Sequence, residues 1–445
     1  MARTRASSST NQHLEPPTAV PTREKRKKNH LHKNPDSYTI NPTVQKSFLN
    51  TLLLHFPNGH SYQIDPPYFL HCCYNNLSTA ATTTLSPIRA ISDDLYKERN
   101  LKRLVEKFKQ YSDVNRFRTK NGIYESTVQR LASAKKFKWI EEILEHQKQY
   151  KSDISKESFA ARLVSLYGKC GLFENAQKVF DEMPDRNCKQ TLKSVNALLG
   201  ASVNSKKYDK LETLFKELPE KLKVKPDVVT YNIMIKGLCD KGALDKAAAL
   251  IDEIEKNGLN PDLVTFNTIL GAFYSTGKFD AGEKVWKLMV SKNVTPDIRS
   301  YNAKLVGLIN NSKVSEAAKL VGELGSFELK PDVFTYGTLI RGYCDKGNLE
   351  EAKKWYLELV KSGSSPNKVI FGSVITAACE KGDFDWAFEL CKDVFKNKCH
   401  VDAELLQGVV DGMVKSSRIW EAKEVVRLGK SNDYHLYKLK LPSDD

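Results

Sequence analysis

The chain contains 445 residues, of which 40% are hydrophobic and 28% are charged, and its formal net charge is +15. Its best candidate for a membrane span, Phe48–Leu54, is far shorter than the roughly 18 apolar residues that a transmembrane helix requires, so none is predicted. The positive charge favours polyanions such as RNA, or a membrane surface, because neutralising phosphates releases condensed counterions. Solubility alone is the alternative explanation.

Residues 1–85 are rich in Pro, Ser, Thr and Asn, contain few acidic residues and show no hydrophobic periodicity. This pattern predicts a disordered leader, and its Ser, Thr and Arg content is typical of an organelle transit peptide. The segment NNLSTAATTT, shortly before Ser86, is consistent with the end of such a peptide. The basic run from Arg23 to Lys28 leaves a nuclear-localisation signal as an alternative.

Residues 86–120 include ISDDLYKERNLKRLVEKFKQY, which predicts a helical pair that caps the segment after it. From residue 121 onward the sequence repeats itself. A Pro-Asp or Pro-Asn dipeptide recurs every 35 residues, at Pro226-Asp227, Pro261-Asp262, Pro296-Asp297, Pro331-Asp332 and Pro366-Asn367. Self-similarity at a fixed period of this length is the signature of a repeat protein.

Each repeat predicts two helices. In Val228–Asp240 the apolar residues recur at helical spacing, Gly242 supplies a break, and a second apolar stripe runs from Leu244 to Ile254. One hairpin of this size cannot bury both stripes, so neighbouring hairpins must stack into an all-α solenoid with a continuous core. The predicted repeats are 121–156, 157–191, 192–227, 228–262, 263–297, 298–332, 333–367 and 368–402, followed by a degenerate terminal repeat at 403–437 and a tail at 438–445.

A 35-residue helical hairpin with Val-Thr-Tyr-Asn near its start and Pro-Asp at its end resembles the pentatricopeptide repeat (PPR) family, over roughly residues 86–437. The resemblance implies a right-handed α-solenoid, and the near-uniform repeat lengths resemble the P subclass. The segments ISDDLYKERNLKRLVEKFK and KSVNALLGASVNSKKYD are similar to plant PPR proteins of the mitochondrial small ribosomal subunit. The tetratricopeptide family has a period of about 34 residues and lacks this signature.

In the PPR family each repeat contacts one RNA base through its fifth and last residues, while a neighbouring residue at the second position of a repeat packs on the face of the base. Carried over to this sequence, the resemblance implies an RNA-binding set of four asparagines, four aspartates and two valines. These are Asn196, Asn232, Asn267, Asn302, Asp227, Asp262, Asp297, Asp332, Val229 and Val264. The family's Asn-with-Asp combination implies uracil. An Asn amide offers both a donor and an acceptor to a base edge, and one base per helical repeat is an established mode of recognition.

The same aspartates stand where a helix N-cap belongs, directly before each apolar helix, so capping alone is the competing interpretation. The pattern also departs from that of an ideal RNA reader. The second position is Lys193, Arg299 or Phe334 in three repeats, and Gly337 and Gly372 leave two repeats without a fifth side chain.

No catalytic or metal-binding pattern is found in the sequence. Cys-x-x-Cys is absent, and the single His-x-Glu, His13 to Glu15, lacks the Pro-Cys-x-x-Cys of a zinc deaminase. We therefore expect no enzyme activity, no metal and no cofactor. Cys239, Cys344 and Cys379 share one repeat position and are predicted to be small buried hydrophobes.

Three functional hypotheses follow. The first is a component of the mitochondrial small ribosomal subunit that contacts ribosomal RNA and ribosomal proteins and supports translation. The second is a sequence-guided factor for single-stranded organelle transcripts, and the third is a protein-only helical scaffold. The predicted location is the mitochondrion, with the chloroplast as the alternative.

Overall fold

The computed structural model describes residues 87–442, which fold into 22 α-helices and short 3₁₀ turns and contain no β-strand. The all-α prediction is confirmed. None of the described helices is long and apolar enough to span a bilayer. The predicted leader at 1–85 and the end of the tail at 443–445 lie outside the described residues.

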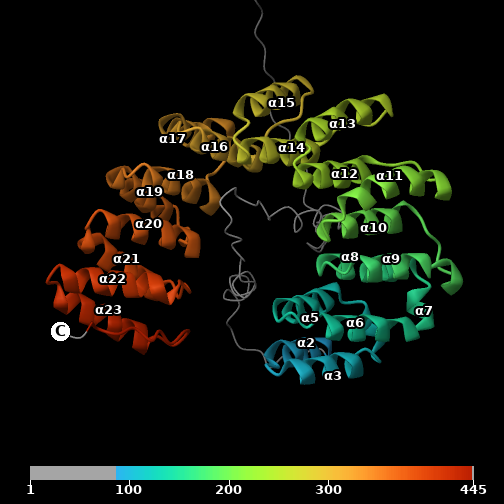
Figure 1. Ribbon diagram of the computed structural model, residues 1–445, viewed down its shortest axis with the longest axis horizontal. Helices are drawn as coiled ribbons and strands as arrows, with labels where there is room; N and C mark the ends of the chain where they lie inside the picture. The colour runs from blue at the N-terminus through green and yellow to red at the C-terminus, as the bar shows by residue number, and fades with distance from the viewer. Residues whose placement is uncertain (1–86, 443–445) are drawn as a thin grey trace, which may run out of the picture. The chain divides into compact units, whose positions relative to one another are not determined.

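The N-terminal helices form a small cluster ahead of the repeats (Figure 1). They are α2 (Pro87–Lys97), α3 (Leu101–Tyr111) and α4 (Asn115–Arg118), and the short helices η3 (Gln147–Gln149) and α7 (Lys151–Ile154) follow the first hairpin. Asn100 caps α3 by accepting hydrogen bonds from the backbone N–H groups of Lys102 and Arg103. Phe108, Phe117 and Tyr124 pack edge-on or tilted against one another and are fully buried.

The rest of the described chain consists of helical hairpins, each with a first and a second helix. In chain order they are α5 (Asn121–Ser133) with α6 (Phe137–His146), α8 (Glu157–Lys169) with α9 (Phe173–Asp181), α10 (Leu192–Asn204) with α11 (Tyr208–Leu222), α12 (Val228–Lys241) with α13 (Leu244–Lys256), α14 (Leu263–Ser275) with α15 (Phe279–Ser291), α16 (Ile298–Asn310) with α17 (Val314–Glu323), α18 (Val333–Asp345) with α19 (Leu349–Lys361), α20 (Lys368–Glu380) with α21 (Phe384–Lys396), and α22 (Ala403–Lys415) with α23 (Ile419–Ser431). The 3₁₀ turns η4 (Pro184–Arg186) and η5 (Leu324–Phe327) follow α9 and α17.

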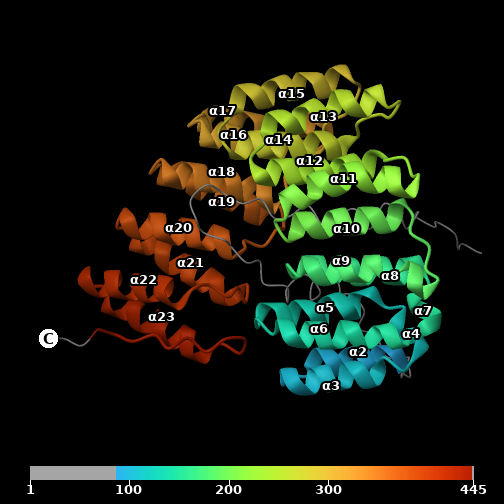
Figure 2. The ribbon, with the colours of Figure 1, turned by 45° about the vertical axis from the view of Figure 1, so that its right-hand side comes forward.

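Neighbouring hairpins lie side by side in chain order (Figures 1 and 2). Each first helix packs against the first helix of the next hairpin, from α8 and α10 through to α20 and α22. The core lies between them: Ile235 on α12, Ile251 and Ile254 on α13, and Ile269 on α14 are at most 1% exposed. Each such side chain contributes about 1.5–3 kcal/mol through burial. The predicted α-solenoid of helical hairpins is confirmed.

The chain turns back after α23. Tyr437 is 1% exposed, and its hydroxyl donates to the backbone oxygen of Val401 and accepts from its N–H. The amide of Gln407 on α22 pairs in both directions with the backbone of Lys440, at 2.8 and 3.0 Å. The predicted tail is therefore held against the last hairpin at Lys440.

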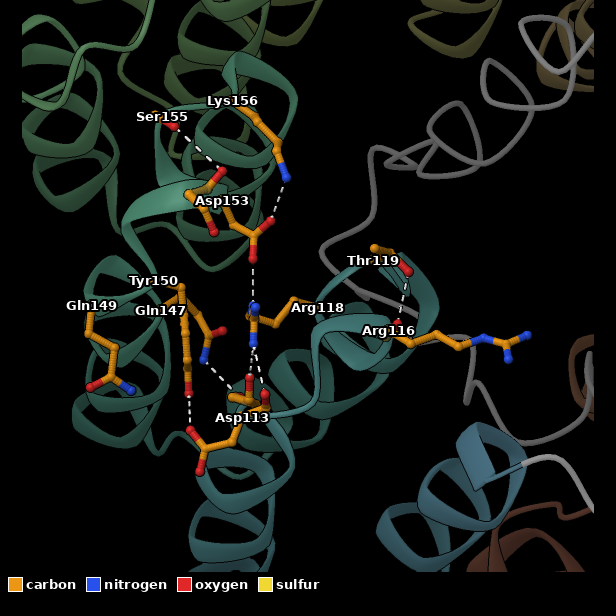
Figure 3. A network of polar contacts seen from close by, with 12 residues as sticks. Asp113, Arg116, Arg118, Thr119, Gln147, Gln149, Tyr150, Asp153, Ser155 and Lys156 are labelled. Carbon is orange, nitrogen blue, oxygen red and sulfur yellow. Dashed lines mark hydrogen bonds and ion pairs between the residues drawn. The ribbon is translucent and has the colours of Figure 1, made fainter.

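A buried ion pair joins the N-terminal cluster to the first hairpins (Figure 3). The Nε of Arg118 lies 2.6 Å from the Oδ2 of Asp153, and its Nη1 donates to the backbone oxygens of Ser112 and Asp113. Tyr150 lies under the guanidinium, 4.1 Å from Cζ to the ring centre, and donates to the Asp113 carboxylate. Burial acts to raise the pKa of Asp153, but hydrogen bonds from Lys156 and Arg118 outweigh it and lower that pKa.

The Asp153→Asn variant should lose about 3–5 kcal/mol of local unfolding free energy, because it leaves the Arg118 guanidinium buried without a counter-charge. Since the folded-state pKa of Asp153 is lowered, the native contribution is present at neutral pH and is lost as the pH falls through that pKa. Hydrogen exchange across α3 to α7 as a function of pH measures both effects. Lys156→Gln is the control, because the Lys156 side chain is 61% exposed and its pair with Asp153 should contribute less than about 1 kcal/mol. Equal losses in the two variants would contradict the assignment.

Candidate nucleic-acid interface

The candidate interface lies along the first turns of α10 to α18. The fifth residue of each first helix from α10 to α16 is an asparagine. These are Asn196, Asn232, Asn267 and Asn302. Asp227, Asp262, Asp297 and Asp332 are the residues directly before α12, α14, α16 and α18. Because each first helix lies beside the next one, every Asn faces the Asp that begins the following helix.

The structure brings each predicted Asn into contact with its predicted Asp. The Nδ2 of Asn232 donates to the Oδ1 of Asp262 at 3.0 Å, and Asn267 donates to Asp297 at the same distance. The two outer pairs are longer: Asn196 to Asp227 is 3.5 Å, and Asn302 to Asp332 is 3.2 Å. We call these four pairs the Asn–Asp ladder.

Each ladder aspartate also caps its own helix. The Oδ1 of Asp262 accepts the backbone N–H of Thr265 at 2.8 Å, and the Thr265 hydroxyl accepts the backbone N–H of Asp262 at 3.1 Å. The same capping box occurs at Asp227, Asp297 and Asp332. A capping box satisfies N–H groups that the first helical turn cannot pair internally. Capping and pairing with Asn are therefore performed by one carboxylate, and neither interpretation excludes the other.

A third group in the ladder was not among the predicted site residues. The hydroxyls of Thr265, Ser300 and Thr335 lie 2.6, 2.6 and 2.7 Å from the Oδ1 atoms of the preceding Asn232, Asn267 and Asn302. Thr or Ser at the third position of these repeats is visible in the sequence. Its contact with the asparagine of the repeat before it follows only from the stacking of the helices.

The predicted base-packing valines are exposed beside the ladder. Val229 is 55% exposed and Val264 is 36% exposed, so both side chains are accessible to a ligand. Val369 occupies the same repeat position and is 44% exposed. The asparagines differ from one another, because Asn302 is 6% exposed whereas Asn232 is only half-buried. Asn302 is therefore the least accessible of the predicted readers.

The ladder ends at both sides for a local reason. Before it, the Glu157 carboxylate bonds to Thr191 and Ser194, the cap residues of α10. Burial acts to raise the pKa of Glu157, but these hydrogen bonds outweigh it and lower that pKa. After it, a Cβ at Gly337 would stand 3.0 Å from the side chain of Ile370, which occupies the position of the Thr and Ser hydroxyls.

Other reactive groups do not gather near the ladder. Burial raises the pKa of Cys239 to about 12 and that of Cys379 to about 11, so both thiols stay protonated at neutral pH. Within residues 87–442 no group of three or more His, Cys, Asp or Glu side chains is placed to hold a metal ion. What the ladder offers chemically is a row of amide and carboxylate hydrogen-bonding groups.

Family models match several stretches of the chain. A PPR repeat family model matches residues 190–240, 226–272 and 261–310, and PPR repeat models match residues 162–188, 327–354 and 369–399. Together the matched stretches include every first helix that contributes to the ladder, from α10 to α18.

Three relatives from Arabidopsis thaliana are similar to parts of this chain. Small ribosomal subunit protein mS79 is 54% identical over 186 residues, which are 42% of this chain and 47% of that protein. Small ribosomal subunit protein mS78 is 56% identical over 182 residues, 41% of this chain and 46% of that protein. A mitochondrial pentatricopeptide repeat-containing protein is 35% identical over 136 residues, 30% of this chain and 32% of that protein. The chain thus spans a little under half the length of the two ribosomal relatives.

The two functions of the ladder aspartates can be separated at Asp262. Asp262→Ala should lower the local stability of α14 by about 0.5–2 kcal/mol, because it removes the cap. Asp262→Ser keeps a capping oxygen and should change the stability by less than about 1 kcal/mol, although the shorter side chain no longer reaches Asn232. Hydrogen exchange at the start of α14 measures the effect. A Ser variant as unstable as the Ala variant would show that the Asn232 contact, and not the cap, holds this junction.

Proposed function

We propose that this chain, a member of the pentatricopeptide repeat family, is an RNA-binding component of the mitochondrial small ribosomal subunit and supports translation. The observation that carries the proposal is the identity of 54% and 56% to two small ribosomal subunit proteins. In this proposal residues 121–402 are the repeats, 86–120 are the N-terminal cap, and the ladder meets RNA.

The ladder supports RNA as the ligand. Amides and carboxylates at one repeat spacing suit unpaired bases, whose hydrogen-bonding edges are accessible in single strands. The exposed side chains of Val229 and Val264 offer apolar surfaces on which base faces can pack. Residues 86–445 contain 60 Lys and Arg against 50 Asp and Glu, and this excess of positive charge supplies the attraction to the phosphate backbone that single-strand binders require.

The same features support binding without catalysis. The ladder aspartates are engaged in capping and in bonds to asparagine, and the Cys239 thiol on α12 stays protonated at neutral pH. We infer that the chain positions RNA and ribosomal proteins and carries out no chemical step. The mitochondrial location rests on the similarity to a mitochondrial relative and on the composition of residues 1–85, which lie outside the described part.

A second function is favoured by one specific observation, the unbroken run of four Asn–Asp pairs. Consecutive readers of this kind suit a factor that recognises a short uracil-rich segment of an organelle transcript. The two functions share the ladder and differ in whether the chain stays attached to the ribosome.

Sedimentation of the tagged protein from a detergent-solubilised mitochondrial extract distinguishes the two. We expect the protein to migrate with small ribosomal subunits and to remain there at high salt. A light peak that is sensitive to ribonuclease would reject the ribosomal role and support the transcript-binding role. The tagged chain without residues 1–85 is the control for import, and it should be missing from the organelle fraction.

The ladder itself is tested by short single-stranded RNA. The double variant Asn232→Ala with Asn267→Ala should weaken binding to uracil-rich RNA by about 1–3 kcal/mol for each base that is no longer read, by analogy with other base readout. Fluorescence anisotropy at low salt measures the affinity, and circular dichroism reports the helical content. Asn348→Ala is the matched control, because Asn348 caps the second helix α19 and lies outside the ladder. Equal affinity of the double variant and the parent would leave these asparagines with a structural role only.

A further inference from the structure

We propose that the third-position hydroxyls of Thr265 and Ser300 fix the orientation of the Asn232 and Asn267 amides, and that this orientation makes the ladder prefer uracil over cytosine. The inference rests on the proposed RNA binding and adds two positioning residues to it. The observation behind it is a pair of short contacts, 2.6 Å each, from the two hydroxyls to the two Oδ1 atoms.

Each of these hydroxyls has one proton to donate. The Thr265 hydroxyl oxygen accepts a hydrogen bond from the backbone N–H of Asp262, and its own proton is available to donate one further hydrogen bond. That proton has two acceptors within reach, the Oδ1 of Asn232 at 2.6 Å and the Oδ1 of Asp262 at 2.9 Å. The shorter contact is to the amide. Ser300 repeats this arrangement with Asn267 at 2.6 Å and Asp297 at 3.0 Å.

Both neighbours therefore favour the same orientation of each amide group. The carboxylate of Asp262 accepts from Nδ2, and the hydroxyl of Thr265 donates to Oδ1. Turning the amide over would place its oxygen against the carboxylate and leave the hydroxyl proton with only the carboxylate as an acceptor. Each Asn is thus held with its N–H side toward the Asp and its oxygen toward the hydroxyl. One N–H and one lone pair remain for a ligand.

The order of that donor and acceptor matters for pyrimidines. Uracil presents an O4 acceptor next to an N3–H donor, whereas cytosine presents an N4 amino donor next to an N3 acceptor. The Asp262 carboxylate and the Thr265 hydroxyl lie only 2.9 Å apart and occupy the N–H and the lone pair on one edge of the amide, so the remaining N–H and lone pair point in different directions and each can contact a base singly. If the remaining N–H meets the 4-position of a base, it can donate to the O4 of uracil but not to the N4 amino group of cytosine, whereas an inverted amide would present its oxygen there and favour cytosine. The orientation of Asn232 and Asn267 is therefore a means of telling the two bases apart.

The first pair of the ladder provides a natural comparison. The Thr230 hydroxyl donates to the Oδ1 of Asp227 at 2.8 Å, and the Oδ1 of Asn196 is buried without a hydrogen-bond partner. The bond from Asn196 to Asp227 is also the longest of the four, at 3.5 Å. Here the same hydroxyl serves the cap and does not hold the amide, so this repeat should contribute little to pyrimidine choice.

The experiment compares the affinities of the full chain for short oligouridine and oligocytidine by competition at low salt. The double variant Thr265→Val with Ser300→Ala keeps similar side-chain volume and removes both hydroxyls. We expect its uracil-to-cytosine affinity ratio to fall by about fivefold for each altered repeat, the equivalent of one ordinary hydrogen bond, through a gain in cytosine binding as well as a loss in uracil binding. Thr265→Ser restores the hydroxyl and should restore the ratio at that repeat.

Two controls separate positioning from folding. Thr230→Val removes the equivalent capping hydroxyl without touching an amide, so it should lower stability as Thr265→Val does and leave the ratio unchanged. If the double variant keeps the parent's ratio, or if Thr230→Val lowers it equally, the positioning role is rejected while RNA binding stands. A parent that binds uracil and cytosine equally overturns the base-reading part of the proposed function, and this inference with it. Sedimentation with the small subunit tests the ribosomal role separately.

Discussion

The organisation of this molecule depends on the unpaired N–H groups at the start of each first helix. Those groups have no partner within the helix and must be capped. In α12, α14, α16 and α18 an aspartate caps them together with a Thr or Ser three residues later. Because the first helices lie side by side, a carboxylate needed for capping also comes within reach of the asparagine on the previous helix. The Asn–Asp ladder is a consequence of capping repeated through a stack.

The same geometry explains how, in the proposed function, a row of carboxylates could face an anionic ligand. Each ladder carboxylate lies at a helix N-terminus, where the helix dipole favours negative charge. The Asp262 carboxylate also accepts bonds from the Thr265 N–H and from Asn232. Much of its charge is thereby satisfied within the protein, and its repulsion of a nearby phosphate is reduced. The groups left for a base are the remaining donor and acceptor of the amide.

The sequence was sufficient for the hairpins and their stacking, because a 35-residue period in apolar residues and Gly breaks determines which faces must be buried. Through the family resemblance it also singled out the Asn and Asp positions that the structure brings into contact, and their binding to RNA stays a prediction. It could not indicate that Asn302 is buried whereas Asn232 is only half-buried, because accessibility depends on neighbouring side chains at the same repeat positions. Nor could it indicate that the backbone of Lys440 forms hydrogen bonds with the side-chain amide of Gln407, since the two residues are 33 positions apart and no periodic pattern links them.

The length of the ladder bears on which function it can serve. A base stacked or bonded by a protein side chain contributes about 1–3 kcal/mol, so even if all four asparagines read bases as proposed they would supply at most about 4–12 kcal/mol before any cost. Association itself costs about 4–15 kcal/mol in lost translational and rotational freedom, which consumes most of that gain. In the proposed function, a free chain with a ladder bounded by Glu157 and Ile370 is therefore expected to gain little affinity for a transcript from base contacts alone. In the proposed ribosomal role, a chain already held on the particle by other contacts would meet its RNA at high effective concentration, and a few base contacts would then be enough to fix the register of a short strand.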